Sequence, residues 1–121
     1  MSTRSPVAPS LEERIRQFLD QNKAENIVQI DLRGKTDFAD TMIIASGSSK
    51  LFLKVLAEKL TEFLHQCGIQ QVSIEGLIAC DWVLVDGHDV VVHLFRPEIR
   101  EIYNLEKMWS MEFHPAVNIV G

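Results

Sequence analysis

The stretch HLFRPEIREIYNLEKMW, residues 93–109, holds several side chains that could do chemistry. A histidine follows a run of β-branched residues, and a segment with helical spacing comes after it. The side chains concerned are His93, Arg100, Tyr103, Glu106 and Trp109. Histidine and glutamate are common in active sites as general bases and acids. Arginine, tyrosine and tryptophan are the types that most often anchor protein interfaces. The segment is therefore either an active site or a surface that holds a partner.

No serine, cysteine or lysine near this segment has the arrangement of an activated nucleophile. A phosphate could dock at GSSK, residues 47–50, where a predicted strand leads into a helix with free backbone N–H groups. This motif matches neither the P-loop pattern nor G-x-G-x-x-G. We therefore expect Gly47 to form a tight turn and Ser48 to cap the helix.

Gly-Ser at this position also resembles the nucleotidyltransferase fold, whose enzymes hold two metal ions with Asp-x-Asp or Glu-x-Asp pairs. Neither pair occurs in the sequence, and Asp81, Asp86 and Asp89 instead cluster around a predicted turn. The four histidines are His65, His88, His93 and His114. None pairs with another at the i, i+4 spacing of helical zinc sites. The sequence therefore predicts no catalytic residue, no metal site and no cofactor.

Residues 97–109 form an apolar arc on a helical wheel of about 100° per residue. The arc consists of Ile99, Ile102, Leu105 and Trp109, and Arg100, Tyr103 and Lys107 form an adjoining stripe. Glu106 falls inside the arc, and a carboxylate on an apolar face needs a partner. We expect Glu106 to pair with His93, which should be half-buried on its strand, or with an arginine. Such a pair more often fixes structure than performs catalysis.

Eight elements should position these residues. Helices are predicted over about residues 11–22, 49–67 and 97–109, and strands over 27–32, 41–46, 71–76, 82–85 and 90–95. Gly68 is a plausible end for the long helix, and Ser10 with Glu13 fits a capping box for the first. DGHD, residues 86–89, should form the turn of an antiparallel hairpin, since Asp-Gly is a favoured turn dipeptide. The order predicts a single α/β domain with one mixed five-stranded sheet flanked by helices. The connection from 41–46 to 71–76 could be a parallel crossover.

The charge distribution points to a basic partner. The chain of 121 residues has a net charge of −5, which argues against a general nucleic-acid binder. Residues 75–112 hold eight acidic and three basic side chains, so they account for the whole net charge. An acidic face attracts a basic partner and speeds its encounter. A solvated acidic surface that aids solubility is the other explanation.

No apolar run approaches the ~20 residues of a membrane span, and the N-terminus has no apolar core of a secretory signal, which predicts a cytoplasmic protein. Cys67 and Cys80 should be reduced thiols. We expect residues 1–9 to be a disordered lead-in, residues 10–110 to be the domain, and residues 111–121 to be a C-terminal tail.

Three stretches resemble the ribosomal silencing factor family, also called Iojap-like proteins. They are ADTMIIASGSS at 39–49, IEG at 74–76 and DWVLVDGHDVVVHLFRPEIREIYNLEKMW at 81–109. The resemblance covers about residues 11–110. It implies a nucleotidyltransferase-like topology without the catalytic acids, and homodimers. It also implies binding to the large ribosomal subunit through large-subunit ribosomal protein number fourteen, which sterically blocks subunit joining and represses translation.

The resemblance also implies roles for individual residues. The expected partner contacts are Trp82, Asp86, His88, Asp89, Arg100 and Tyr103. The expected structural supports of the site are His93, Glu106, Trp109, Glu75, Gly76, Asp40, Gly47 and Ser49. Gly87-His88 departs from the family pattern, in which a bulkier residue often stands beside a glycine.

Two other classes of function stay open at this point. One is a degenerate or active nucleotidyltransferase-like enzyme. The absence of an Asp-x-Asp or Glu-x-Asp pair argues against it. The other is a purely structural homodimer, in which the same aromatic residues would contact a second copy.

Overall fold

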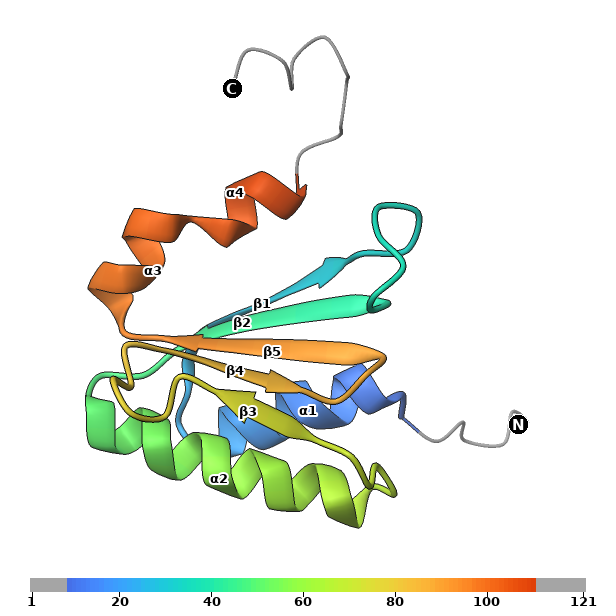
Figure 1. Ribbon diagram of the computed structural model, residues 1–121, viewed down its shortest axis with the longest axis horizontal. Coiled ribbons are helices and arrows are strands. Elements are labelled where there is room, and N and C mark those ends of the chain that lie inside the picture. Colours follow the sequence, from blue (N-terminus) through green and yellow to red (C-terminus); the bar gives the residue numbers. More distant parts are fainter. Residues whose placement is uncertain (1–8, 111–121) are drawn as a thin grey trace, which may run out of the picture.

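A computed structural model describes residues 9–110 of the chain and shows one five-stranded sheet with helices on both faces (Figure 1). The helices are α1 (Leu11–Gln21), α2 (Lys50–Gln66), α3 (Pro97–Tyr103) and α4 (Leu105–Ser110). The strands are β1 (Glu25–Asp31), β2 (Thr41–Ser46), β3 (Ser73–Glu75), β4 (Trp82–Asp86) and β5 (Val90–Phe95). The predicted fold class is confirmed. The predictions for residues 1–8 and 111–121 lie outside the described residues.

The strand order is β1-β2-β5-β4-β3. The central strands β2 and β5 are parallel, whereas β1 pairs antiparallel with β2 and the hairpin β4–β5 is antiparallel. Because β3 is also antiparallel to β4, it runs parallel to β2. The connection through α2 is therefore a parallel crossover, as predicted, but it skips β5 and β4 to reach the far edge.

Each face of the sheet carries its own apolar cluster. Helices α1 and α2 cover one face, where Ile43, Val83, Val92 and Leu94 pack against Leu53 and other buried residues of α2 (Figure 1). Helices α3 and α4 lie over the other face, near β1 and β5. Both central strands are buried along their whole length, as in sheets covered on both faces.

The ends of the first two helices follow local capping chemistry. The predicted capping box is present, because the Ser10 hydroxyl accepts from the Glu13 N–H and the Glu13 carboxylate accepts from the Ser10 N–H. The cap of α2 is Ser49, whose Oγ accepts from Phe52 N–H at 3.1 Å. The prediction of Ser48 was wrong by one residue. Gly68 follows the end of α2 with φ +96°, as predicted for a glycine stop.

The last helix is broken at Asn104, which the sequence did not predict. Asn104 has φ 49° and ψ 53°, a left-handed conformation that asparagine tolerates better than most residues. Its side-chain oxygen accepts from Lys107 N–H at 3.3 Å and so helps to start α4. The continuous helical wheel was therefore wrong, and Ile102 is 72% exposed instead of joining an apolar arc.

The hairpin turn lies within DGHD, as predicted. The left-handed residue is His88, with φ 76°, and not Gly87. The Asp86 carboxylate accepts from His88 N–H at 2.8 Å, which is the local bond that aspartate often makes in turns. Gly87 is buried instead, where a Cβ would lie 3.4 Å from Leu64. The glycine thus permits close packing and the histidine forms the exposed tip.

Candidate functional site

A groove opens on the face of the sheet that α3 and α4 cover only in part. Strand side chains alternate between faces, so Trp82 and Leu84 of β4 share this face with His93 of β5. We define the aromatic groove by Phe38, Trp82, Leu84, His93, Leu105 and Trp109, and its volume is about 280 Å³. The sheet provides its floor, and the loop before β2 and helix α4 provide its walls.

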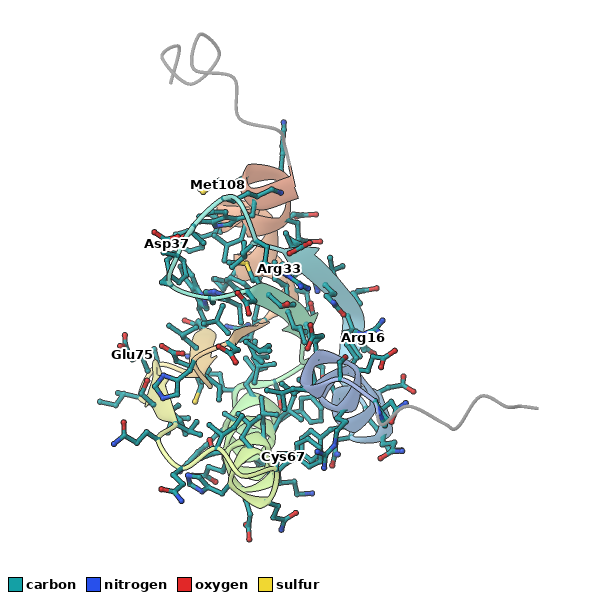
Figure 2. The ribbon with its side chains drawn as sticks, turned by 90° about the vertical axis from the view of Figure 1, so that its right-hand side faces the viewer. Arg16, Arg33, Asp37, Cys67, Glu75 and Met108 are labelled. Atoms are coloured by element: carbon teal, nitrogen blue, oxygen red, sulfur yellow. The ribbon has the colours of Figure 1, made fainter. Side chains whose placement is uncertain are left out.

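A second hollow of about 270 Å³ borders Trp82 where the short edge strand β3 ends at Glu75 and is followed by Gly76. The two hollows share Trp82, Leu84 and His93, so they form one indented surface. In Figure 2 Asp37, beside Phe38, and Glu75 project on the same side of the molecule, whereas Arg16 of α1 projects on the opposite side.

Trp82 is held in one orientation by three aromatic neighbours. Its Nε1–H donates to His93 Nδ1 at 2.8 Å. Its ring stacks on Phe95 with centroids 4.9 Å apart, and the Tyr103 ring lies 4.7 Å away. Trp82 remains partly exposed, and Tyr103 is 53% exposed. The predicted contact residues Trp82 and Tyr103 therefore form a preorganised aromatic surface, which reduces the entropy lost on binding.

His93 is more deeply placed than predicted, since only 9% of it is exposed. It lies between Leu84 of β4 and Ile44 of β2. Burial lowers the pKa of His93 from 6.5 to about 4, because the charged imidazolium loses hydration. The imidazole is therefore neutral at pH 7. Its partner is Trp82 and not Glu106.

This burial gives a testable dependence of stability on pH. Below pH 6.5 the unfolded chain protonates His93, whereas the folded chain does so only near pH 4. As the pH is lowered from 6.5 to about 4, the free energy of unfolding should therefore fall by about 3 kcal/mol. Above pH 6.5 the ionisation of His93 should not affect it. Urea unfolding at a series of pH values measures it. The pKa values of Asp31, Asp81 and Glu106 lie below their ordinary values, so these groups act at lower pH.

Two variants separate the His93 effect from other groups. His93→Asn removes the titrating ring and should flatten the profile between pH 6.5 and 4. His65→Asn replaces an exposed histidine of α2 and should retain the wild-type profile. A His93→Asn profile as steep as that of the wild type would show that another group causes the loss.

Arg100 and Glu106 form an ion pair away from the aromatic groove. Arg100 Nε and Nη2 donate to the two Glu106 carboxylate oxygens at 2.8 and 3.0 Å, and Nη1 donates to Ser46 Oγ at 2.7 Å. The hydrogen bonds from Arg100 hold the pKa of Glu106 below its ordinary value. The prediction that Glu106 pairs with an arginine is confirmed. Arg100, predicted to touch a partner, is only 9% exposed and instead ties α3 to α4 and β2.

The acidic hairpin turn lies at the border of the groove. Asp86 is partly exposed and lines the groove, while His88 and Asp89 are exposed. The Asp89 carbonyl accepts from Asp40 N–H at 2.9 Å and from Thr41 N–H at 3.1 Å. Asp40 therefore supports the site through its backbone, which attaches the loop before β2 to the turn.

Three of the predicted support residues act through local geometry. Gly76 has φ +94°, and a Cβ there would lie 2.2 Å from the Trp82 carbonyl oxygen, so only glycine fits. A Cβ on Gly47 would lie 2.6 Å from the Phe52 ring. Ser49 caps α2. Trp109, also predicted as support, is partly buried and lines the groove.

Sequence reasoning did not identify Phe38 or Leu84. Phe38 is 61% exposed, and its ring makes an edge contact with Trp109 at 6.2 Å between centroids. The backbone carbonyl of Trp109 accepts from Lys35 Nζ at 2.5 Å, which links the loop to α4. A lone aromatic residue in the polar stretch RGKTDFAD was the available sequence sign for Phe38. Alternation from Trp82 would have identified Leu84.

Residues 9–110 show neither a cluster of metal ligands nor a membrane-spanning helix. In that range no group of three or more His, Cys, Asp or Glu side chains could hold a metal ion. None of the helices there is long and apolar enough to cross a bilayer.

The chain was compared with known families, proteins and structures. A family model described as "Ribosomal silencing factor during starvation" matches residues 5–119. Ribosomal silencing factor RsfS of Zymomonas mobilis is 47% identical over 92 residues, which is 76% of this chain and 69% of that protein. "Mitochondrial assembly of ribosomal large subunit protein 1" of Mus musculus is 34% identical over 97 residues, or 78% of this chain and 42% of that protein. A crystal structure from Chromobacterium violaceum has a TM-score of 0.78 at 32% identity and covers 85% of this chain and 86% of that one.

Proposed function

Because this chain belongs to the ribosomal silencing factor family, we propose that it binds the large ribosomal subunit and keeps the small subunit from joining it. The proposed contact on the ribosome is large-subunit ribosomal protein number fourteen. Once bound to that ribosomal protein, the chain sterically blocks subunit joining and represses translation. The name of the Mus musculus relative, which refers to assembly of the ribosomal large subunit, supports the choice of subunit.

The observation that carries this proposal is the aromatic groove with its acidic border. Trp82 is fixed by His93 and Phe95 before any partner arrives, yet part of its surface stays exposed. Rigid aromatic side chains in a partly enclosed hollow are typical anchors of protein interfaces. Asp86 in the groove and Asp89 beside it add negative charge. A partner with an apolar projection and basic neighbours fits this surface.

The structure refines which residues we propose as contacts. The set is Trp82, Tyr103, Asp86, His88 and Asp89, to which Phe38 and Leu84 are added. We assign Arg100 to the supporting residues, because its guanidinium group donates hydrogen bonds to Glu106 and Ser46. His93 supports Trp82 through its Nδ1 atom.

We extend the proposal to the location and the free form of the protein. The chain acts in the cytoplasm, and in the absence of ribosomes it forms a homodimer. The dimer would be tested by sedimentation equilibrium over a range of protein concentrations.

Binding to the ribosome is tested by sedimentation with purified subunits. The protein should travel with the large subunit and not with the small subunit. Purified ribosomal protein number fourteen, added in excess, should release it. Failure to travel with the large subunit would contradict the proposal, and failure of the competitor would contradict the choice of ribosomal protein.

The acidic border predicts that binding depends on salt. Exposed ion pairs are screened over about 10 Å at 0.1 M salt, so affinity for the ribosomal protein should fall as salt is raised. The double variant Asp86→Asn with Asp89→Asn should bind more weakly at low salt by roughly 1 kcal/mol and show a flatter salt dependence. Titration calorimetry at several salt concentrations measures both effects.

The choice of asparagine keeps the turn intact, because its Oδ1 atom can still accept from His88 N–H as Asp86 does. The matched control is Glu58→Gln with Glu62→Gln, which removes the same charge from exposed positions of α2, on the far side of the sheet. The control should keep the wild-type salt dependence. Equal effects of the two double variants would assign the dependence to net charge and not to the acidic border.

A further inference from the structure

The second nitrogen of the buried residue His93 makes no hydrogen bond within residues 9–110. Since Nδ1 accepts from Trp82 Nε1–H, the neutral ring carries its proton on Nε2. The bond at Nδ1 is the one hydrogen bond that the His93 side chain makes to the described residues, so Nε2–H has no acceptor among them. The residue is only 9% exposed, and a buried donor without an acceptor is costly.

His93 is part of the indented surface. His93 lines both the aromatic groove and the second hollow, and Trp82 and Leu84 lie beside it in both. The bond to Trp82 fixes the tautomer and the ring orientation, so the position of the Nε2–H is also fixed. A donor in a hollow lined mainly by apolar and aromatic side chains gives directional recognition, as the few polar groups of binding sites do.

On the basis of the proposed function, we propose that His93 Nε2–H donates to a backbone carbonyl of the ribosomal partner. An apolar side chain next to that carbonyl fills the aromatic groove, and a lysine or arginine beside it pairs with Asp86. His93 is thus both a support for Trp82 and a residue that determines which segment of a partner can dock.

The charge of the site selects a neutral acceptor. Asp86 lines the same groove, so a carboxylate of the partner would meet a like charge while losing its hydration. A backbone carbonyl loses much less on burial and carries no charge. The same aspartate favours a basic side chain in the segment that docks.

The open shape of the indented surface favours a protein segment over an enclosed organic ligand. The aromatic groove of about 280 Å³ and the second hollow of about 270 Å³ share Trp82, Leu84 and His93, and both are open at the surface. Small-molecule sites, by contrast, bury most of their ligand. One apolar side chain with its adjoining backbone suits this space.

Two isosteric variants separate the two nitrogens of His93. Asparagine places its side-chain oxygen near the Nδ1 position, so His93→Asn should keep the bond from Trp82 while it removes the donor at Nε2. Glutamine places its amide nitrogen near the Nε2 position, so His93→Gln should keep that donor. Its bond with Trp82 should be impaired. Thermal unfolding and the indole N–H resonance of Trp82 report whether each variant keeps the fold and the Trp82 bond.

Affinity for purified ribosomal protein number fourteen is then compared at pH 7. His93→Asn should bind about tenfold more weakly, equivalent to about 1.4 kcal/mol, with the Trp82 resonance retained. His93→Gln should bind within about threefold of the wild type even if its melting temperature is lower. Wild-type affinity in His93→Asn overturns the inference while leaving the proposed function standing. Absence of wild-type binding overturns the proposed function and the inference together.

A direct observation tests the hydrogen bond itself. In ¹⁵N-labelled protein the His93 Nε2–H proton should shift downfield when the ribosomal protein is added, because it gains an acceptor. A purely structural His93 would show no such shift. A resonance that is already at the hydrogen-bonded position in the free protein, and stays there on binding, contradicts the inference.

Discussion

Replacing Arg100 by methionine is expected to lower the free energy of unfolding by about 3 kcal/mol. The Arg100 side chain is 10% exposed, and its guanidinium group makes three hydrogen bonds, to Glu106 and Ser46, that join three elements. Removing one partner of a buried ion pair costs about 3–5 kcal/mol. We expect the lower end, because the Glu106 side chain is 32% exposed and can regain water. Urea unfolding measures the change.

A second variant and a control define the cause of this loss. Arg100→Met combined with Glu106→Leu removes both charges and should recover much of the lost stability. Arg33→Met removes an arginine whose side chain is 64% exposed and should leave stability nearly unchanged. Equal stability of Arg100→Met and the wild type would contradict the structural role.

The same variant tests whether Arg100 also contacts the partner. At a temperature where Arg100→Met is folded, its affinity for ribosomal protein number fourteen should lie within about twofold of the wild-type value. A large loss of affinity in the folded variant would return Arg100 to the contact residues.

Replacing Trp82 by alanine is expected to weaken binding to ribosomal protein number fourteen by about 2 kcal/mol or more, roughly 30-fold in Kd. Trp82 has the largest side chain shared by the two hollows, and it is oriented before binding. The loss reflects removal of a preorganised anchor and of the surface around it. Titration calorimetry with folded protein measures it.

Stability and binding must be separated for this variant, because Trp82 also stacks on Phe95 and lies against Tyr103. Trp82→Phe keeps an aromatic ring in the stack and loses the bond to His93, so its affinity should lie between those of alanine and wild type. All titrations are done well below each melting temperature. Undiminished affinity in folded Trp82→Ala would remove this residue from the contacts.

Local sequence patterns were sufficient for the parts of the fold that depend on local physics. Alternation along one strand placed His93 and Phe95 on one face of the sheet, because successive strand residues point in opposite directions. The capping box at Ser10 and the glycine stop at Gly68 depend on bonds within a few residues of the chain. The assignment of partner, by contrast, depended on the resemblance of whole stretches and not on any single pattern.

The patterns were insufficient where tertiary contacts decide. The apolar spacing of residues 97–109 continues across Asn104, so the wheel gave no sign of the left-handed residue that redirects α4. Arg100 was predicted to be a surface residue, because the sequence does not show that Ser46 lies beside it. Phe38 was missed because its loop joins the groove only through contacts with α4 that are distant in sequence.

For His93, the local pattern predicted the strand and its face, whereas tertiary contacts determined the hydrogen-bond partner. Its strand and its face followed from alternation, but its partner did not. Glu106 was a reasonable candidate on a continuous helix, whereas the break at Asn104 leaves Glu106 paired with Arg100 and His93 paired with Trp82. A pairing of two titratable side chains that is predicted from a helical wheel holds only if the helix is continuous.

The central claim is that the bound protein prevents joining of the ribosomal subunits. The most direct test is sedimentation of purified large and small subunits at a magnesium concentration that permits joining, with and without the protein. We expect the protein to travel with the large subunit and the joined particle to decrease, with Trp82→Ala ineffective at the same concentration. Normal joining in the presence of saturating wild-type protein would contradict the account.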